Sequence, residues 1–279
     1  MPRNNLRLSR IGILAACAAL GLCSSCRGAL GNGRNSRASG QAAATSPSPQ
    51  LIPTPGPLFS PPDLKPVSKV DSAFKPCNPY YPLVPGSVAK YTVRNSGRVT
   101  ANMEVVVNAN DDQRKKTTTE ISQQVETDRG QMQTTTRKCV CDGGRVEVIS
   151  QIIDAKVRVG ESRAGSARLE SKFPSTAVVM DAPASLTPGD SWSYSMVGTV
   201  IEEKRPPLTQ EPIQLGFQVK GSEDVSVPAG TFKTIHITGT IKGHQLDEYY
   251  APGIGLVKRV SDTGISWELT EYTGLKPLP

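Results

Sequence analysis

Histidine, the side chain that most often moves protons near neutral pH, occurs at two positions in this chain, His236 and His244. In the run 231–241, strand alternation puts His236 on the face opposite an aliphatic stripe, which favours a surface or hydrogen-bonded imidazole. His244 follows a Lys-Gly turn, so the two histidines could meet across a hairpin. No cysteine or carboxylate stands beside them at a recognisable ligand spacing. The sequence therefore predicts no metal site and no cofactor.

Carboxylate pairs and nucleophile motifs offer no better catalytic constellation. Asp247-Glu248 and Glu202-Glu203 are adjacent in sequence, so in a strand the members of each pair point to opposite faces and make poor acid–base partners. We expect both pairs to be solvated charges at strand edges. The sequence also lacks a glycine-rich phosphate loop, a metalloprotease motif and a nucleophile elbow. These observations predict a protein that is not an enzyme.

The first 26 residues have the organisation of an export signal. Arg3, Arg7 and Arg10 precede an apolar run at 11–22. This run is shorter than the ~20 residues that a membrane-spanning helix needs, but it suits the apolar part of a signal peptide. No second apolar run of spanning length follows it. We therefore expect the chain to be exported.

The cysteines at the end of this run resemble the lipobox region of bacterial lipoproteins, in which cleavage falls just before a cysteine that becomes lipid-modified. Cys26 follows two serines and a full apolar run, so we predict Cys26 as the lipidation site. Cys23 and Cys17 are alternatives, although the apolar run before Cys17 is short. An ordinary signal without lipid, cleaved near Ala29, is a further alternative. Lipidation would anchor the chain to the periplasmic face of a bacterial membrane or to the cell surface.

Export also predicts a disulfide, because exported proteins meet an oxidising environment. After cleavage at Cys26, three further cysteines remain: Cys77, Cys139 and Cys141. Cys139 and Cys141 lie two apart on an expected strand, so they face the same way and are too stretched to join each other easily. We predict a bond from Cys77 to either Cys139 or Cys141, with one thiol left over.

Residues 27–66 consist mainly of Gly, Ser, Ala, Asn and Pro. Such a segment has too few apolar side chains to offset the entropy lost on ordering, so we predict a disordered linker that spaces a domain from the membrane. A proline-rich motif for an aromatic groove is the alternative.

The formal net charge of +7 does not indicate nucleic-acid binding. Seven of the 32 Lys and Arg residues and one of the 25 Asp and Glu residues precede residue 67. The rest of the chain therefore has 25 basic and 24 acidic residues. This near-neutral part lacks the clustered basic face that phosphate binding needs.

The remaining sequence has the pattern of antiparallel β-structure, with polar turns rich in Gly and Asp recurring every ~10–15 residues. The stretch 186–194 matches the stretch 83–91, with Leu, Pro, Gly and Tyr at the same places. We predict an all-β fold of antiparallel meanders in two related β-units, 67–180 and 181–279, arranged as an open barrel or a sandwich. Residues 162–172 are expected to form a short helix or a loose hairpin. The expected strands are 87–95, 98–108, 116–126, 131–141, 145–153, 175–180, 190–203, 213–220, 224–227, 231–241, 244–250, 256–261 and 265–272.

Three motifs after residue 186 carry a family resemblance. They are Gly-x-x-Trp-x-Tyr at 189–194, Val-Pro-Ala-Gly-Thr-Phe at 227–232, and Tyr-Ala-Pro-Gly-Ile-Gly-Leu-Val-Lys at 250–258. This part of the chain resembles a group of exported bacterial proteins of uncharacterised function, many of which have lipoprotein leaders. The resemblance covers residues 186–272, whereas over 80–153 only the opening stretch fits. It implies a β-rich envelope protein and brings no catalytic residues.

A curved antiparallel sheet with an aliphatic inner face can hold an apolar or lipid-like ligand. We therefore expect a non-catalytic envelope lipoprotein that binds such a ligand or an unknown envelope protein. A structural or assembly component of the envelope is the main alternative, and a hydrolytic enzyme is a further one; an apolar cleft would favour ligand carriage. The expected aliphatic stripes are Met103/Val105/Val107 and Ile235/Ile237/Ile241, and the aromatics expected at the mouth of a concave site are Trp192, Tyr194, Phe232, Tyr249 and Tyr250.

Overall fold

The computed structural model describes residues 75–113, 116–127, 132–159, 163–172, 178–180, 186–202, 206–209 and 211–278. The leader, the linker and the three cysteines considered for lipidation lie outside these ranges, so the expectations for them stay predictions. The strands are β1 (Val88–Asn95), β2 (Arg98–Gln113), β3 (Lys116–Thr127), β4 (Met132–Asp142), β5 (Arg145–Val159), β6 (Arg163–Lys172), β7 (Val178–Met180), β8 (Ser191–Glu202), β9 (Leu208–Thr209), β10 (Ile213–Val227), β11 (Gly230–Ile241), β12 (His244–Ala251), β13 (Gly255–Ser261) and β14 (Ile265–Thr273).

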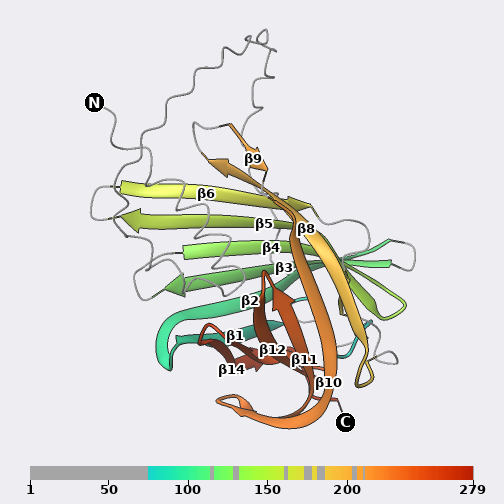
Figure 1. The fold of residues 1–279 in the computed structure, drawn as a ribbon. Helices are drawn as coiled ribbons and strands as arrows, with labels where there is room; N and C mark the ends of the chain where they lie inside the picture. Colours follow the sequence, from blue (N-terminus) through green and yellow to red (C-terminus); the bar gives the residue numbers. More distant parts are fainter. Residues whose placement is uncertain are drawn as a thin grey trace, which may run out of the picture.

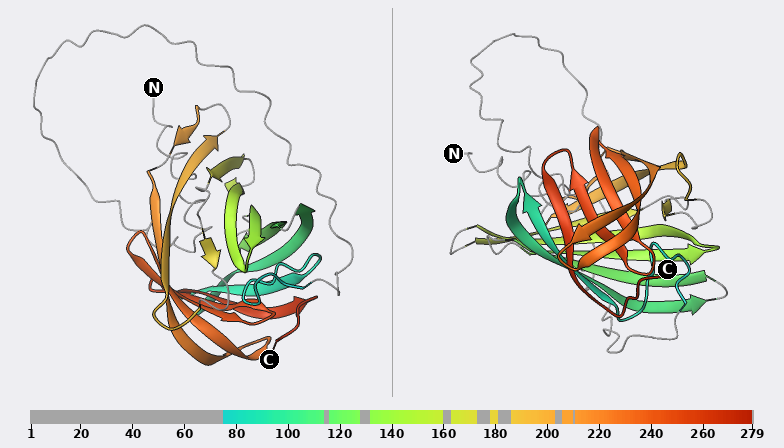
Figure 2. Two further views of the ribbon diagram at one scale, coloured as in Figure 1. Left: turned by 90° about the vertical axis from the view of Figure 1, so that its right-hand side faces the viewer. Right: turned by 90° about the horizontal axis from the view of Figure 1, so that it is seen from below.

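These strands form a single antiparallel sheet, which confirms the all-β prediction. Most neighbours in the sheet are consecutive in the chain: β1 to β6 form one arc, β10 to β14 form the other, and β1 pairs with β14 between them. Figures 1 and 2 show the two arcs curving around a common interior. The two expected β-units thus contribute to one sheet, and a domain boundary near residue 180 stays a prediction.

Strand β8 connects the far ends of the two arcs. Its first half, residues 191–196, pairs with β10, and its second half, residues 197–202, pairs with β6. No residue of β8 therefore pairs with both β6 and β10, so the sheet curves strongly but is not closed into a cylinder. Near its end, Thr199 and Val200 pair with the short strand β9 on the side away from β6. Among the described residues, no helix has the length and apolarity needed to cross a membrane.

Two strands continue where the sequence predicted a turn. β2 runs on to Gln113, past the expected end at residue 108. β10 continues through Gly221, which has a φ of 152° and lies at a register shift against β11, so this glycine bends the strand without ending it. Residues 163–172 form β6 and pair with β5, which corresponds to the hairpin alternative and not to the helix.

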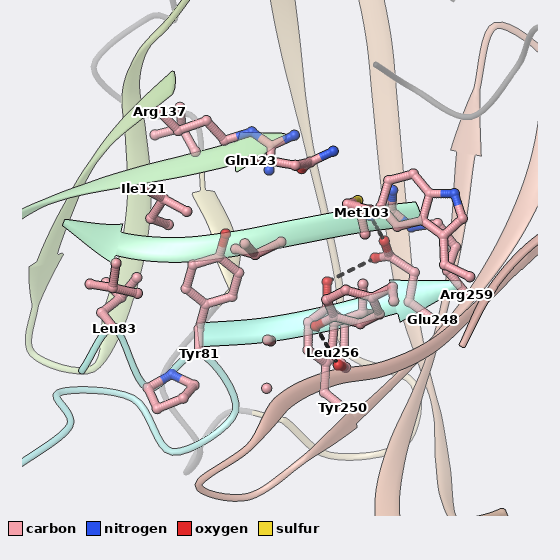
Figure 3. Close-up of a pocket in the computed structure, with 18 of the residues that line it drawn as sticks. Tyr81, Leu83, Met103, Ile121, Gln123, Arg137, Glu248, Tyr250, Leu256 and Arg259 are labelled. Carbon is pink, nitrogen blue, oxygen red and sulfur yellow. Dashed lines mark hydrogen bonds and ion pairs between the residues drawn. The ribbon is translucent and has the colours of Figure 1, made fainter. Parts of the chain in front are cut away.

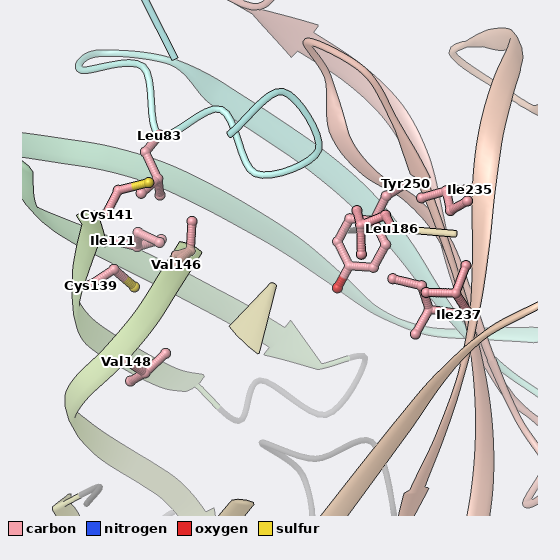
Figure 4. Packing of buried hydrophobic residues seen from close by; sticks show 11 residues of the cluster. Leu83, Ile121, Cys139, Cys141, Val146, Val148, Leu186, Ile235, Ile237 and Tyr250 are labelled. Atoms are coloured by element: carbon pink, nitrogen blue, oxygen red, sulfur yellow. The ribbon is translucent and has the colours of Figure 1, made fainter. Parts of the chain in front are cut away.

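The two arcs contribute buried side chains that face each other across the interior (Figure 4). Ile121 and Val148 come from β3 and β5, and Ile235, Ile237 and Tyr250 come from β11 and β12. A second cluster around Trp267 and Leu269 fills the region where β1, β13 and β14 meet. The core therefore depends on both arcs.

Residues 77–87, called here the pre-strand segment, cross from one arc to the other ahead of β1. At one side, Cys77 is bonded to Cys141, with the two Cα atoms 6.2 Å apart. Beside this bond the fully buried Asn78 donates its side-chain amide to the Gly144 carbonyl over 2.7 Å. At the other side, the Gly253 amide donates to the Pro79 carbonyl over 2.7 Å. This segment thus ties the β4–β5 hairpin to the β12–β13 turn.

The two matching stretches that end in Tyr91 and Tyr194 have the same local hydrogen bonds. Ser87 N donates to Val84 O over 3.0 Å, and Asp190 N donates to Thr187 O over 3.0 Å. The glycine of each turn, with φ of 78° at position 86 and 100° at position 189, donates its amide to a neighbouring strand, β2 or β10. The sequence match therefore corresponds to a repeated turn that starts a strand.

Candidate functional site

The interior of the curved sheet contains a cavity of about 190 Å³. An apolar cavity of ~150 Å³ is already large enough to stay dry and admit benzene. Both arcs and the pre-strand segment contribute to its wall, which Figure 3 shows from close by. Its apolar lining includes Met103, Val105, Ile121, Met196, Leu215 and Leu246.

One polar group in the wall is a buried ion pair between β12 and β13. Glu248 lies directly opposite Arg259 in the strand register, and the Arg259 guanidinium donates to the Glu248 carboxylate. The side chains are 5% and 21% exposed, so both charges are largely removed from water. The Tyr250 hydroxyl donates to the same carboxylate over 3.2 Å, and the guanidinium carbon of Arg259 lies 4.1 Å from the centroid of the Trp267 ring. Sequence analysis placed Glu248 at a solvated strand edge, and the structure corrects this because Arg259 neutralises it inside the sheet.

A second polar group lies on the opposite arc, where β3, β4 and β5 run side by side. Arg137 on β4 pairs across the strands with Ile121 on β3 and Gln151 on β5. Its Nε donates to the Gln151 side-chain oxygen over 2.8 Å. Gln123 stands two residues beyond Ile121 on the same face of β3, and Figure 3 shows it beside Arg137 at the cavity. We call Gln123, Arg137 and Gln151 the polar row.

The polar row has unused hydrogen-bonding capacity. Gln123 is 3% exposed, and its side-chain nitrogen has no partner among the described residues. Among the residues that the structure describes, no carboxylate forms an ion pair with Arg137. Buried polar groups normally have partners, because an unmade hydrogen bond costs about 1–3 kcal/mol. The row therefore offers donors to a polar group inside an otherwise apolar cavity.

Several tyrosines complete the wall, and burial dominates their chemistry. Burial raises the pKa of Tyr194 to about 12, and it also raises the pKa values of Tyr81, Tyr91 and Tyr250 well above the ordinary value of a tyrosine. The Tyr91 hydroxyl donates to the Leu256 carbonyl over 2.8 Å. These phenols stay neutral in the physiological range, so they can donate hydrogen bonds but cannot act as anions.

The five aromatics expected at a concave mouth do not gather at one place. Tyr194 and Tyr250 line the cavity. Trp192 stacks on Phe217 at 5.4 Å between ring centroids and is not one of the residues that line the cavity. Phe232 packs edge-on against Tyr272 in the second core cluster. Tyr249 points away from Tyr250 and stacks on His236, because adjacent strand residues face opposite sides of a sheet.

The histidines lie away from the cavity. Nδ1 of His236 is 3.0 Å from Glu223 Oε1, and its Nε2 is 3.0 Å from Asp247 Oδ1. His244 is 3.4 Å from a carboxylate oxygen of Asp262, and both side chains are more than 40% exposed. Among the residues that the structure describes, no three His, Cys, Asp or Glu side chains are grouped so that they could hold a metal ion.

Of the two disulfides that the sequence left open, the structure contains the bond from Cys77 to Cys141. Cys139 is free and fully buried on the same strand face. Burial raises the pKa of the Cys139 thiol to about 12, so this thiol is neutral and unreactive in the folded protein.

The residues that sequence reasoning missed are Gln123, Arg137, Glu248 and Arg259. Gln123, Arg137 and Glu248 face inward by the ordinary alternation of their strands, whereas the residues that lie opposite Arg137 and Glu248, Gln151 and Arg259, are set by two register shifts. Ile149 is unpaired between Cys139↔Val148 and Lys138↔Ser150, and Val257 is unpaired between Tyr249↔Lys258 and Tyr250↔Leu256. Each bulge changes which residues of its strand face inward, and nothing in the local sequence marks it.

No family model matches the chain, and no curated protein matches it. One solved structure similar in fold is a candidate lipoprotein from Parabacteroides distasonis, with a TM-score of 0.44 and 14% identity over 71% of this chain and 100% of that one. Another is a candidate exported protein with a YmcC-like fold from Bacteroides fragilis, with a TM-score of 0.44 and 12% identity over 67% of this chain and 95% of that one. At this level of similarity neither structure assigns a function to the chain.

Proposed function

We propose that this chain is an exported, non-catalytic binding protein that holds an apolar or lipid-like ligand inside its curved sheet. The observation that carries the proposal is the cavity of about 190 Å³, whose wall is mainly aliphatic and aromatic. A protein that only scaffolds other components has no need of such a space, and an aliphatic interior of this kind selects ligands by burial of apolar surface.

The arrangement of the histidines supports a non-catalytic role. A histidine that acts as a general base needs one ring nitrogen directed at the substrate. Both ring nitrogens of His236 contact carboxylates of Glu223 and Asp247, and its ring stacks on Tyr249 outside the cavity. The cavity wall itself contains no histidine or cysteine among the described residues.

The surface gives less support to a role in assembly. The large apolar side chains that are exposed in the described part of the chain come from β2, β5, β8, β9 and the C-terminal tail. A docking face would gather such side chains into one patch. The exposed residues are Val99, Ile149, Val197, Leu208 and Leu278.

Ligand binding is tested by filling the cavity. Val105 lines the cavity on β2, whereas Val99 on the same strand is 44% exposed. Val105→Phe should weaken binding of the uncharged dye N-phenylnaphthylamine by about tenfold or more, while Val99→Phe should leave it within about twofold. Equal binding by the wild type and both variants would refute a ligand site in this cavity.

We also propose that the mature chain is anchored through a lipid on Cys26. The supporting observation is the charged leader, the apolar run and the two serines before that cysteine. Mass spectrometry of the mature N-terminus should find a diacylglyceryl-modified Cys26, and Cys26→Ser should release the protein from membranes. An unmodified terminus downstream of Cys26 would contradict the anchor.

A further inference from the structure

We propose that the ligand is an amphiphile with an alkyl chain and an anionic oxygen headgroup, and that the headgroup binds to Arg137 and Gln123. This proposal rests on the proposed ligand-binding function and specifies the chemistry of that ligand. It starts from the contrast between the aliphatic wall of the cavity and the few polar side chains placed in it.

The charges that line the cavity do not balance. Arg259 and Glu248 neutralise each other as an ion pair. Arg137 adds a second guanidinium, and no carboxylate among the described residues pairs with it. Arg137 is half-buried, and a guanidinium beside an apolar wall favours an anionic partner, because water competes less for its hydrogen bonds there than on an open surface. The cavity therefore has a site for one negative charge.

The donors at this site have a fixed geometry. Gln151 accepts the Nε–H of Arg137 over 2.8 Å, and this bond orients the guanidinium. The terminal nitrogens of Arg137 have no acceptor among the residues that the structure describes. Gln123 adds a side-chain nitrogen that is buried and has no partner among the described residues, and its pair with Thr135 lies two residues along the strands from the pair Ile121↔Arg137. A carboxylate or phosphate oxygen would satisfy both, and Figure 3 shows the two side chains close together at the same end of the cavity.

The polar row depends on the register of the strands that carry it. The bulge at Ile149 turns Gln151 inward, so that it lies opposite Arg137. Without this shift the residue opposite Arg137 would be Ser150, and Gln151 would point out of the sheet. Bulges that redirect a side chain are common next to binding sites. From the polar row the aliphatic residues Ile121, Met103 and Leu246 continue the wall, where an alkyl chain would lie.

The experiment compares three probes with the same alkyl chain: dodecanoate, dodecyl phosphate and dodecanol. Binding is measured by calorimetry and by the fluorescence of Trp267, which lines the cavity. A hydrogen-bonded charge is worth roughly a 10- to 100-fold change in affinity, so the two anions should bind more tightly than dodecanol by that factor. Whichever anion binds better identifies a fatty acid or a phospholipid-derived headgroup as the source.

Variants separate the headgroup site from the alkyl site. Arg137→Gln should weaken both anions about 10- to 100-fold and leave dodecanol within about twofold. Arg98→Gln removes the same charge from an exposed position at the start of β2 and should change none of the three. Gln123→Leu removes an unpartnered buried donor, so the variant should fold normally and lose about 3- to 10-fold in anion affinity.

Two results would overturn the headgroup assignment. One is a wild-type protein that binds dodecanol as tightly as the anions, and the other is an anion preference that survives in Arg137→Gln. In both cases dodecanol binding would still uphold the proposed function. Failure of all three probes to bind would refute the apolar site as well as the headgroup.

Discussion

Removing one partner of the ion pair between Glu248 and Arg259 should lower the free energy of unfolding strongly. Removing both charges together should lower it by less than the sum of the two single changes. The Glu248 side chain is 5% exposed and the Arg259 side chain 21% exposed, so solvent screens them little. In Glu248→Gln the Arg259 guanidinium stays in an apolar wall without its carboxylate. In Arg259→Met the Glu248 carboxylate stays there without its guanidinium. Removal of one partner of a buried pair costs about 3–5 kcal/mol.

The double variant Glu248→Gln/Arg259→Met leaves no buried charge, so its cost should be close to that of one single variant. A loss of about 3 kcal/mol corresponds to a drop in Tm of roughly 6–12 °C for a domain of this size. Urea denaturation and thermal melting of the wild type, the two single variants and the double variant form a double-mutant cycle. Glu271→Gln is the matched control, because it breaks the Lys90–Glu271 pair at 2.9 Å, in which the side chains are 44% and 59% exposed. The reasoning is refuted if the single variants melt like this control, or if the double variant loses the sum of the two single effects.

Four further predictions concern thiols and protons. The unfolded, unreduced mature protein should have one reactive thiol, Cys139, because Cys77 and Cys141 are bonded; a titration that finds three would contradict the bond. In the native protein that thiol should stay unreactive near pH 8, because burial raises its pKa to about 12. Burial likewise raises the pKa of Tyr194 from 10.0 to about 12. The contribution of this neutral phenol to stability is therefore complete below pH 10 and is lost as the pH rises toward 12. In thermal melting experiments, Tyr194→Phe should lose less stability than the wild type over this alkaline range. Burial opposes the charge of Asp247, but hydrogen bonds from the neighbouring imidazole and hydroxyl lower the pKa of its carboxyl below 3.8. The contribution of this carboxylate to stability is therefore present above pH 3.8 and is lost as the pH falls through the lower pKa of the folded state. Asp247→Asn should therefore reduce the loss of stability that acid causes, as measured by thermal melting at a series of pH values.

The strands were predictable from the sequence because their ends are marked by local chemistry. Pro-Gly and Asp-Gly turns and two-residue alternation depend on neighbouring residues only, so they are visible without the fold. The start of β8 after Pro188-Gly189 and the hairpin at Lys242-Gly243 follow these signals closely. The continuity of β10 was not predictable, since Gly221 can either end a strand or bend it.

The candidate site was much less predictable, because it depends on register across strands. Counting back from the turn pair Ala251↔Gly255 without a bulge would place Glu248 opposite Lys258. The shift between Tyr249 and Tyr250 moves every later pair by one residue, so Glu248 faces Arg259. The charge pattern of β12 alone cannot distinguish a solvated carboxylate from one that is paired inside the sheet. The same argument applies to Arg137, whose partner Gln151 is set by the bulge at Ile149.

The disulfide connects the expected environment of the protein to the shape of its cavity. The bond from Cys77 to Cys141 closes a loop with a sequence separation of 64, which by chain entropy stabilises the fold by about 4 kcal/mol. It also fixes one end of the pre-strand segment, which carries Tyr81 and Leu83 into the cavity wall. In a reducing compartment that end would depend on the hydrogen bond from Asn78 to Gly144, while the other end would still depend on the amide of Gly253. The bond therefore stabilises this part of the cavity wall in an environment where disulfides persist, which is the environment that the leader predicts.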